Sequence, residues 1–470
     1  MPRIRLPPCD TSAVLAPAKR STSRRSELLL ALGVLLISSF VIHDWTAQPA
    51  SRYALTVAVV DDHSLQLDPY EDFLGVDQAQ FDGHIYSDKA PYQPILAAPF
   101  YYLYRLAGGD PYPAGFSSGD FDAATNYGLW WVTLWSAAIP AAALAVVIRR
   151  MVARTHSEVA TRVTVAIMLA TTLLPFASQL FAHVLAALCV AAAWHLLRRH
   201  DYPSTAAVFA AGVIAGVGIG TEYLVAVIAA IMLVHVATLR SWSRVVALSA
   251  GTVIATLPLL AYNWLVFGDP FELAYQGHLK TFKGAGALGV YNLETPGWSD
   301  ISRTLAGPKG LFILTPVVLM AVAGAIFAIK ERGRTRRDAW VALASLAIML
   351  AASTGIDGYG GGSPGPRYMI PALPLLAVPL ASAWRRFPIL CGGTTVVGAA
   401  VMLLATITNP VTEQGLDYWL DFLWSGQLAR NVLTGTDQPW VLLVTTAAGV
   451  ALIVTLVVQE RGTSPPAGSN

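Results

Sequence analysis

Residues 24–45 have the sequence RRSELLLALGVLLISSFVIHDW, in which an apolar run from Leu28 to Ile42 follows basic residues. Such a run, preceded by positive charge, predicts a membrane-spanning helix whose N-terminus faces the cytoplasm. A secretory signal would end in a small-residue cleavage site, whereas this run continues directly into Asp44. We therefore expect it to be retained as the first span, behind a cytoplasmic tail formed by residues 1–26.

The composition extends this interpretation to the whole chain. Of its 470 residues, 55% are hydrophobic and only 13% are charged, which is about half the charged share of a soluble domain. A water-soluble globule cannot bury that much apolar surface, so the composition excludes a soluble enzyme, a disordered scaffold and a nucleic-acid binder. The further apolar runs are 125–148, 162–179, 183–197, 204–221, 223–239, 245–263, 310–329, 338–356, 369–384, 388–407 and 439–458. We predict an all-α polytopic membrane protein with about 12 transmembrane helices.

The charged residues favour one orientation of these spans. With both termini in the cytoplasm, 22 of the 31 basic residues lie inside and 22 of the 29 acidic residues lie outside. Cytoplasmic loops of membrane proteins carry an excess of Lys and Arg, so this asymmetry supports the arrangement. The cytoplasmic loops are then short, whereas the outer loops 45–124, 264–309 and 408–438 are long. We predict one transmembrane domain over 27–458, a disordered cytoplasmic tail at 459–470, and a bacterial plasma-membrane location.

The loop lengths restrict where chemistry can take place. The sequence has no P-loop and no dinucleotide-binding fingerprint, and its cytoplasmic loops are too short for a nucleotide-binding module. An enzymatic site must therefore face outward and use a donor that is present there, such as a lipid-linked sugar. The cysteines and histidines show no ligand spacing, so we expect no protein-encoded metal site. A Mg²⁺ or Mn²⁺ ion that bridges aspartates and a substrate phosphate is compatible with the acidic outer loop.

The first outer loop combines two amphipathic segments with a dense polar pattern. Residues 51–60 and 94–106 each predict a short helix that lies on the membrane surface. Between them stand several aspartates and then, at 82–92, the sequence DGHIYSDKAPY. Acidic clusters in loops are usually just solvated, so this pattern alone does not select one carboxylate.

The order of motifs in this loop is informative. Arg52-Tyr53-Ala54 is followed by an apolar helix and then by Tyr86-Ser87-Asp88-Lys89-Ala90-Pro91. This order resembles the first periplasmic loop of the GT-C glycosyltransferase superfamily, which includes lipid A aminoarabinose transferases and protein mannosyltransferases. The chain is also similar to a bacterial branch that carries the Tyr-Ser-Asp-Lys-Ala-Pro motif, including Asn263, Phe267-Gly268-Asp269-Pro270 and residues 360–368.

The resemblance implies a fold and an activity. The fold would be GT-C-like, with a large first outer loop that contains interfacial amphipathic helices. The activity would be a hexosyl- or pentosyltransferase that moves a sugar from a polyprenyl-phosphate donor to a glycan, lipid or protein acceptor. The reaction would take place on the outer face of the membrane, and nucleic acid would have no part in it.

The resemblance also implies phosphate contacts and raises a question about the base. Lys89 matches the family's phosphate contact by motif, and Arg52 belongs to the Arg-Tyr motif before it. Arg367, in a glycine-rich turn at an outer helix start, suits phosphate recognition but equally suits anchoring a helix at the interface. The family's catalytic Asp-Glu pair aligns here with Pro49-Ala50, so no acid stands at that position. Another carboxylate must serve, or the chain does not catalyse the family reaction.

The mechanism narrows the choice of carboxylate. Sugar transfer needs a base for the acceptor hydroxyl and cations near the departing phosphate. Our first candidates for the base are Asp82 and Asp88, because they flank the motif, and the alternatives are Asp44, Asp61 and Asp62.

Further candidates are His84 and Tyr86 in the motif segment, and Glu222 between two apolar runs. Glu222 is either a wet turn residue or, if it is buried, a functional candidate, because charge inside a membrane protein is expensive.

Two other functions stay open at this point. A transporter or flippase of lipid-linked sugar would need broken or charged helices at mid-membrane, often with a repeat of spans, and we find no repeat. A non-catalytic relative that binds lipid-linked sugar is suggested by the absent Asp-Glu pair. A covalent product in a transfer assay would indicate an enzyme and exclude both the transporter and the non-catalytic relative.

Overall fold

The computed structural model describes residues 24–43, 46–110, 127–276, 278, 295–331, 333–355, 361–412, 414–435 and 438–462. The candidate Asp44, most of the N-terminal tail and residues 463–470 lie outside this part of the chain. The last helix continues to Gly462. The predicted boundary at residue 459 therefore falls inside this helix, whose last turn includes the polar residues Gln459, Glu460 and Arg461.

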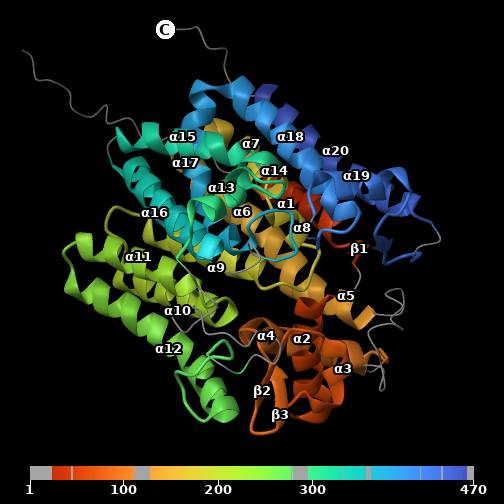
Figure 1. Ribbon diagram of the computed structural model, residues 1–470. Coiled ribbons are helices and arrows are strands. Elements are labelled where there is room, and N and C mark those ends of the chain that lie inside the picture. Colours follow the sequence, from red (N-terminus) through yellow and green to blue (C-terminus); the bar gives the residue numbers. More distant parts are fainter. Residues whose placement is uncertain are drawn as a thin grey trace, which may run out of the picture.

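Helices dominate the described residues, and every predicted span contains helix. The bundle consists of α1 (Arg24–Ser38), α5 (Tyr127–Thr133), α6 (Ile139–Ala153), α7 (Ala160–Leu169), α8 (Leu173–Phe176), α9 (His183–Leu197), α10 (Thr205–Thr221), α11 (Val225–Thr238), α12 (Trp242–Phe267), α13 (Trp298–Ala306), α14 (Leu311–Leu314), α15 (Val317–Ile329), α16 (Arg334–Gly355), α17 (Ala377–Arg386), α18 (Pro388–Ile407), α19 (Leu416–Trp424) and α20 (Trp440–Gly462). Figure 1 shows these helices packed around one another, and α20 packs mainly against α1.

The lengths and apolarity of the helices support a multi-pass membrane protein. In the described part of the chain, five helices can cross a membrane by length and composition: Tyr127–Ala153, which joins α5 and α6, and α12, α16, α18 and α20. The apolar helices α9, α10 and α11 are shorter. The predicted all-α polytopic class is confirmed, whereas the count of 12 spans stays a prediction.

Three of the predicted spans are interrupted. The run 162–179 is divided between α7 and α8, and the run 310–329 between α14 and α15. The segment Trp298–Leu314 meets α15 at 93°. The run 369–384 begins as a 3₁₀ helix, Arg367–Leu376, before α17. Two prolines lie inside that 3₁₀ helix, and proline lacks the N–H that an α-helix requires.

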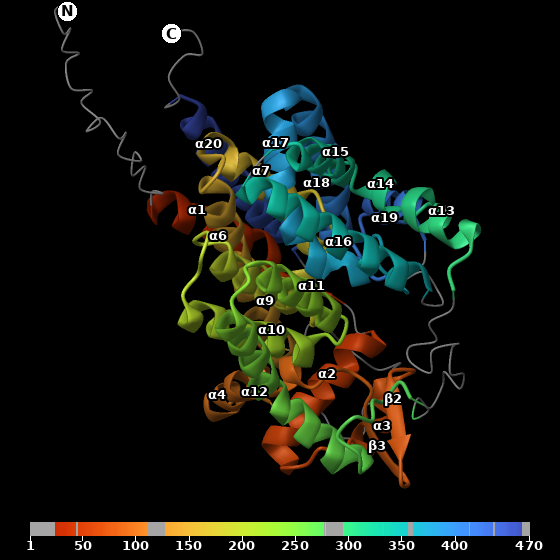
Figure 2. The same ribbon diagram turned by 90° about the vertical axis from the view of Figure 1, so that its left-hand side faces the viewer.

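The first outer loop folds into a small unit of its own. It contains α2 (Ala47–Val57), α3 (Glu71–Leu74), β2 (Gln78–Phe81), β3 (His84–Ser87) and α4 (Tyr92–Leu106). Figures 1 and 2 show this unit at one end of the bundle, beside the last turns of α12. The strands form an antiparallel hairpin, with Phe81 opposite His84. Its turn is Asp82-Gly83, where both residues have positive φ, as this type of hairpin requires.

This loop unit has a second apolar core, and that core bears on one expectation. Its buried side chains come from the loop and from the end of α12, including Tyr262 and Phe267. In α2, which overlaps the predicted surface helix 51–60, every residue from Pro49 to Val57 is covered by other parts of the protein, so the helix does not rest on the membrane by its bare side chains alone. The helix is covered because α3, α4 and β3 all pack against it. By contrast, α4 keeps exposed apolar side chains, among them Leu103 and Leu106.

Glycines bring α10 and α12 close together. A Cβ added at Gly212 would lie 2.2 Å from the Leu248 carbonyl oxygen, and one at Gly251 would lie 2.3 Å from that of Phe209. Small residues at such a crossing allow the two backbones to touch, as membrane helices commonly do. Helix α10 therefore packs directly on α12, and Glu222 follows the last residue of α10, Thr221.

The helices α1 and α20 pair in opposite directions. Glu27, near the start of α1, lies 2.6 Å from Arg150, and Glu460, near the end of α20, lies 2.8 Å from Arg149. Because these two arginines are neighbours in α6, the described ends of the chain lie at the same end of the bundle, as Figure 2 also shows. At the other end, β1 (Val41–Ile42) pairs with β4 (Arg430–Asn431) in an antiparallel ladder.

A buried ion pair joins α9 to α16 and generates a stability prediction. Arg198 donates to both oxygens of Asp338, at 2.8 Å and 2.6 Å, and Trp194 donates to the same carboxylate. Because Asp338→Ala would leave the Arg198 charge buried without a partner, it should cost about 3–5 kcal/mol. We expect the melting temperature in detergent, measured by scanning fluorimetry, to fall by at least about 5 °C.

The matched control for this prediction is Asp201→Ala. Asp201 is exposed and pairs with Arg334 and Arg337, so its removal should cost less than about 1 kcal/mol. Equal melting temperatures for the two variants would contradict the role assigned to the buried pair.

Candidate functional site

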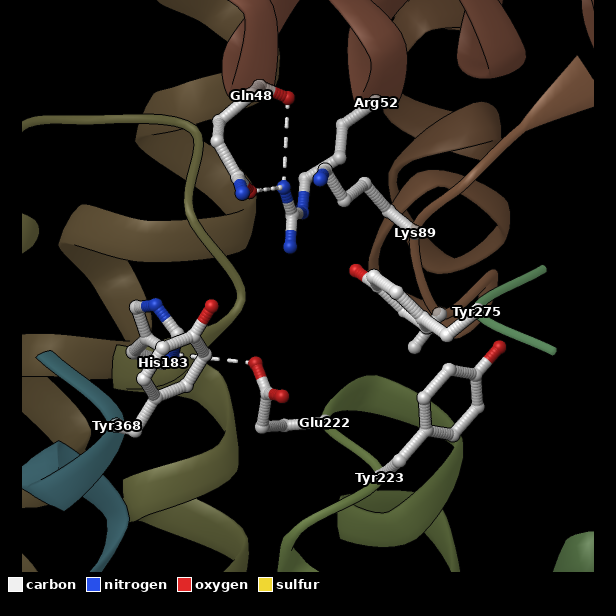
Figure 3. A pocket seen from close by; sticks show the side chains of 9 residues that line it. Gln48, Arg52, Lys89, His183, Glu222, Tyr223, Tyr275 and Tyr368 are labelled. Carbon is white, nitrogen blue, oxygen red and sulfur yellow. Dashed lines mark hydrogen bonds and ion pairs between the residues drawn. The ribbon is translucent and has the colours of Figure 1, made fainter. Parts of the chain in front are cut away.

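Two side chains of α2 reach an outer cavity from one face of that helix. Gln48 and Arg52 are four residues apart, so they are neighbours on the helix surface. Nη1 of Arg52 donates to Oε1 of Gln48 at 2.5 Å and to the Gln48 carbonyl at 3.3 Å. The guanidinium, which belongs to a side chain only 3% exposed, is held by neutral groups and extends into the cavity (Figure 3).

The Ser87-Asp88-Lys89 segment follows β3 and is held against α2. Oγ of Ser51 lies 2.8 Å from Oγ of Ser87 and donates to Oδ1 of Asp88 at 3.3 Å. Nζ of Lys89 lies between two carboxylates, 2.7 Å from Asp88 and 3.0 Å from Asp77. All three charged side chains are buried. The positive charge of Lys89 is therefore already neutralised by Asp77 and Asp88 within the protein.

Tyr92 fixes this segment to the membrane helices. Its hydroxyl donates to the Ala255 carbonyl at 2.6 Å and accepts from the Leu259 N–H at 3.0 Å. The hydroxyl thus stands in place of the direct backbone hydrogen bond between Leu259 and Ala255 in α12. Its ring lies against Gly220, where an added Cβ would be 2.3 Å from a ring carbon. The start of α4 is thus fixed to both α10 and α12, and Lys89 lies only three residues before it.

The far wall of the cavity comes from bundle segments that are distant in the sequence. His183 is the first residue of α9, and Glu222 stands between α10 and α11. The complete lining is Gln48, Arg52, Lys89, Ala90, His183, Glu222, Tyr223, Tyr275 and Tyr368. The empty space is about 280 Å³, part of it open to solvent. In Figure 3 the side chains of Arg52 and Glu222 point into it from opposite sides.

Two buried guanidinium groups flank the same aromatic ring. Cζ of Arg52 and Cζ of Arg367 each lie 5.8 Å from the ring centroid of Phe181. Among the described residues, neither guanidinium is ion-paired with a carboxylate, and each Nε is buried without a hydrogen-bond partner. An unpaired buried charge is costly. The arrangement therefore favours an anionic ligand whose oxygens arginine can bind in a forked geometry.

The carboxylates of the cluster differ in their electrostatics. Burial raises the pKa of Asp88 to about 6, with Lys89 opposing the shift and Asp77 adding to it. Burial opposes the charge of Lys89, but Asp77 and Asp88 outweigh it and raise the pKa of Lys89, which stays protonated. Burial likewise opposes the charge of Glu222, but the contact with His183 and the nearby arginines Arg52 and Arg367 lower the pKa of Glu222. Glu222 is therefore ionised at neutral pH.

The structure brings together only part of the set chosen from the sequence. Lys89, Arg52 and Glu222 line the cavity. Arg367 adjoins it, because its guanidinium stacks near Tyr368, which lines the wall. Asp88 lies behind Lys89 as its ion-pair partner.

The other candidates lie elsewhere in the loop unit. Asp82 is exposed at the hairpin turn, and His84 is an exposed partner of Asp68 at 2.8 Å. Tyr86 packs in the second apolar core. Asp61 accepts from Tyr101 and lies 3.2 Å from Arg105, while Asp62 accepts from Tyr70. These side chains hold the loop together and do not line the cavity.

Several lining residues were not among the sequence candidates. His183 lines the cavity, and Asp77 lies behind the lining as an ion-pair partner of Lys89. Gln48 had a usable signal, because it stands one turn before Arg52 on the same helix face. Within the described residues, no group of three His, Cys, Asp or Glu side chains is placed to hold a metal ion.

Comparisons with known proteins bear on the fold. No protein-family model and no curated protein matches this chain. Among solved structures, ArnT from Cupriavidus metallidurans bound to undecaprenyl phosphate matches with a TM-score of 0.54 and 14% sequence identity. That match covers 93% of this chain and 74% of ArnT. The chain has the GT-C fold of ArnT. The apo state of ArnT matches with a TM-score of 0.51 and 13% identity, covering 93% and 73%.

The GT-C fold agrees with the expectation drawn from the motif order in the first outer loop. At 14% identity the likeness is one of fold. The bacterial branch and the roles of individual residues therefore stay predictions, which depend on the local geometry of the cavity.

The ion pairs of Lys89 generate a pH prediction for the binding of an anion. The Asp88 carboxyl has an ordinary pKa of 3.8, raised here to about 6, so it gains a proton as the pH falls from about 7.5 to 5. Protonation removes a negative charge next to Lys89, and an anionic ligand then meets less repulsion. In Asp88→Asn that charge is absent at every pH.

We therefore expect Asp88→Asn to bind an anionic probe, inorganic phosphate, about tenfold more tightly than wild type near pH 7.5. The ratio of the two affinities should fall toward one near pH 5, and taking the ratio cancels the titration of the phosphate itself. Microscale thermophoresis would measure both, with Asp82→Asn at the exposed turn as control. A ratio that does not change with pH would contradict the assignment.

Proposed function

We propose that this chain is a membrane glycosyltransferase that transfers a sugar from a polyprenyl-phosphate donor to an acceptor on the outer face of the membrane. The observation that carries the proposal is the pair of buried guanidinium groups near Phe181 that have no carboxylate partner among the described residues, one of which, Arg52, lines the same cavity as Lys89. A lipid phosphate would supply the missing negative charge. The GT-C fold supports the proposal, since ArnT has been solved with undecaprenyl phosphate bound.

The cluster suits a departing phosphate. When the bond between the sugar and the phosphate breaks, negative charge grows on the phosphate oxygens. Arg52 and Arg367 offer forked N–H groups that match those oxygens, and Lys89 adds a point charge. Tyr275 and Tyr368 supply aromatic faces in the same wall, and such faces suit the apolar side of a sugar ring.

The proposal includes an orientation and a lineage. Glu27 and Glu460 pair with neighbouring arginines of α6, and the excess of basic residues at that end favours the cytoplasmic side. The cavity would then open to the outer face, with both termini in the cytoplasm. We place the chain in the GT-C branch with the Tyr-Ser-Asp-Lys-Ala-Pro motif because that motif supplies Lys89 and its partner Asp88.

The phosphate contacts can be tested by binding. Arg52→Ala removes a charge-assisted contact worth about 1.5–3 kcal/mol, so the affinity for undecaprenyl phosphate should fall about tenfold to hundredfold. The matched control is Arg105→Ala, which removes an arginine of the same loop that pairs with Asp61 away from the cavity. Thermophoresis in detergent would measure both variants, and equal losses would show that no specific phosphate site exists.

The reaction can be tested with purified protein in liposomes that contain polyprenyl-phosphate sugars and membrane-extract acceptors. We expect a radiolabelled covalent product, greatly reduced in Lys89→Ala. Accumulation of labelled donor across the membrane without a product would indicate a transporter or flippase. Donor binding with neither product nor transport would indicate a non-catalytic relative, for which the empty acid position at Pro49-Ala50 provides the argument.

The orientation can be tested by cysteine labelling. In a variant without native cysteines, a cysteine at Ser64 in the first outer loop should react with a membrane-impermeant maleimide in intact cells. A cysteine at Ser157, between α6 and α7, should react only after permeabilisation. The reverse pattern would invert the proposed topology.

A further inference from the structure

Glu222 is the one carboxylate among the described lining residues, and no salt bridge joins it to a lysine or an arginine there. Asp77 and Asp88 are both in contact with Nζ of Lys89, at 3.0 Å and 2.7 Å. The position where related transferases carry an acid is Pro49-Ala50. Among the described residues that line the cavity, Glu222 alone is acidic.

Glu222 is placed by rigid neighbours rather than by a flexible loop. Its backbone is extended after the last turn of α10, and its N–H still donates to the Gly218 carbonyl at 2.8 Å. Its own carbonyl accepts from the N–H of Val225, at the start of α11, at 2.9 Å. The side chain is 7% exposed.

His183 holds one oxygen of this carboxylate. Nδ1 of His183 lies 3.1 Å from Oε2 of Glu222, an ion-pair distance, although neither ring nitrogen makes a hydrogen bond with good geometry among the described residues. The imidazole is itself boxed by aromatic rings, with centroids 5.4 Å away for Phe176, 6.0 Å for Phe181 and 5.9 Å for Tyr368. The other oxygen, Oε1, has no hydrogen-bond partner among the described residues and faces the cavity in Figure 3.

The charges are arranged on opposite sides of the cavity. Arg52 enters from α2, and Glu222 enters from the α10–α11 junction (Figure 3). A nucleophilic displacement requires the attacking oxygen to approach from the side opposite the leaving group. A phosphate bound at the arginines and an acceptor hydroxyl at Glu222 would satisfy that requirement.

We propose that Glu222 is the general base of the transfer, with His183 as the residue that positions it. This inference rests on the proposed function. In the step, the acceptor hydroxyl oxygen forms a bond to the anomeric carbon, and the bond from that carbon to the phosphate oxygen breaks. The electron pair of the broken bond stays on the lipid phosphate, which the cations hold. The hydroxyl proton moves to Oε1 of Glu222.

The principal test separates chemistry from binding. Glu222→Gln keeps the size of the side chain and removes the base, so kcat should fall by a factor of about 10²–10⁴. The affinity for undecaprenyl phosphate should be unchanged or tighter, because a negative charge has been removed near the phosphate site. Asp72→Asn, at an exposed position in α3, is the matched carboxylate control and should leave both quantities unchanged.

A rescue experiment covers the case in which the substitution disturbs folding. Glu222→Ala opens space beside His183, and added formate can then supply a carboxylate to that space. We expect formate to restore part of kcat in Glu222→Ala and to have no effect on wild type or on Lys89→Ala. Partial activity of Glu222→Asp, with normal phosphate affinity, would support the same conclusion.

The positioning role of His183 has its own readout. His183→Gln can still donate to Glu222, whereas His183→Phe cannot. We expect kcat to be higher in the glutamine variant than in the phenylalanine variant, at equal affinity for undecaprenyl phosphate. Equal kcat values in the two variants would remove His183 from the inference.

The outcomes distinguish this inference from the proposed function. If wild type transfers sugar and Glu222→Gln retains kcat within about threefold, Glu222 is not the base while the proposed function stands. If wild type binds undecaprenyl phosphate but yields no product with any polyprenyl-phosphate sugar, the proposed function fails and the inference fails with it.

Discussion

Charge compensation inside a chain with few charges is the constraint on which the rest of the structure depends. Arg52, Lys89 and Arg367 are all buried at the outer end of the bundle. Each needs a partner, because a bare charge in a medium of low dielectric is costly. Asp77 and Asp88 satisfy Lys89, but the described residues give the two arginines no carboxylate. Among the described residues, Lys89 is therefore ion-paired with two carboxylates, whereas Arg52 and Arg367 are not ion-paired.

The loop unit buries the side of the cavity that carries Arg52 and Lys89. Its own apolar core surrounds α2, so the arginine and lysine approach the cavity from a packed element and not from a solvated loop. The bundle meets it with the rigid junctions before α9 and α11. Burial on both sides removes water from the cations, and this strengthens their attraction for an anion. The same packing explains why α2 is covered by other parts of the protein.

The sequence predicted the class, the motif order and the cations better than it predicted the carboxylates. Apolar runs are long and periodic signals, and the side of the membrane is encoded in the basic residues. Lys89 and Arg52 stand in motifs close to each other in the loop. Asp82 and Asp88 both precede Lys89 in the same short segment, yet one is exposed at a turn and the other is buried. Glu222 lies 133 positions after Lys89, so only the packing of α10 against α12 and Tyr92 brings it to the cavity.

Tyr92 has a consequence for how this protein can change over time. Its hydroxyl bridges Ala255 and Leu259 across the place where Pro258 interrupts α12, and its ring fills the space that Gly220 leaves open. A larger residue at position 220 would displace the ring of Tyr92. A smaller residue at position 92 would leave the Ala255 carbonyl and the Leu259 N–H without these hydrogen bonds. Substitutions at positions 92 and 220 should therefore occur together. That linkage offers a way to recognise distant relatives in which the lysine is presented in the same manner, even where the overall identity is too low to align.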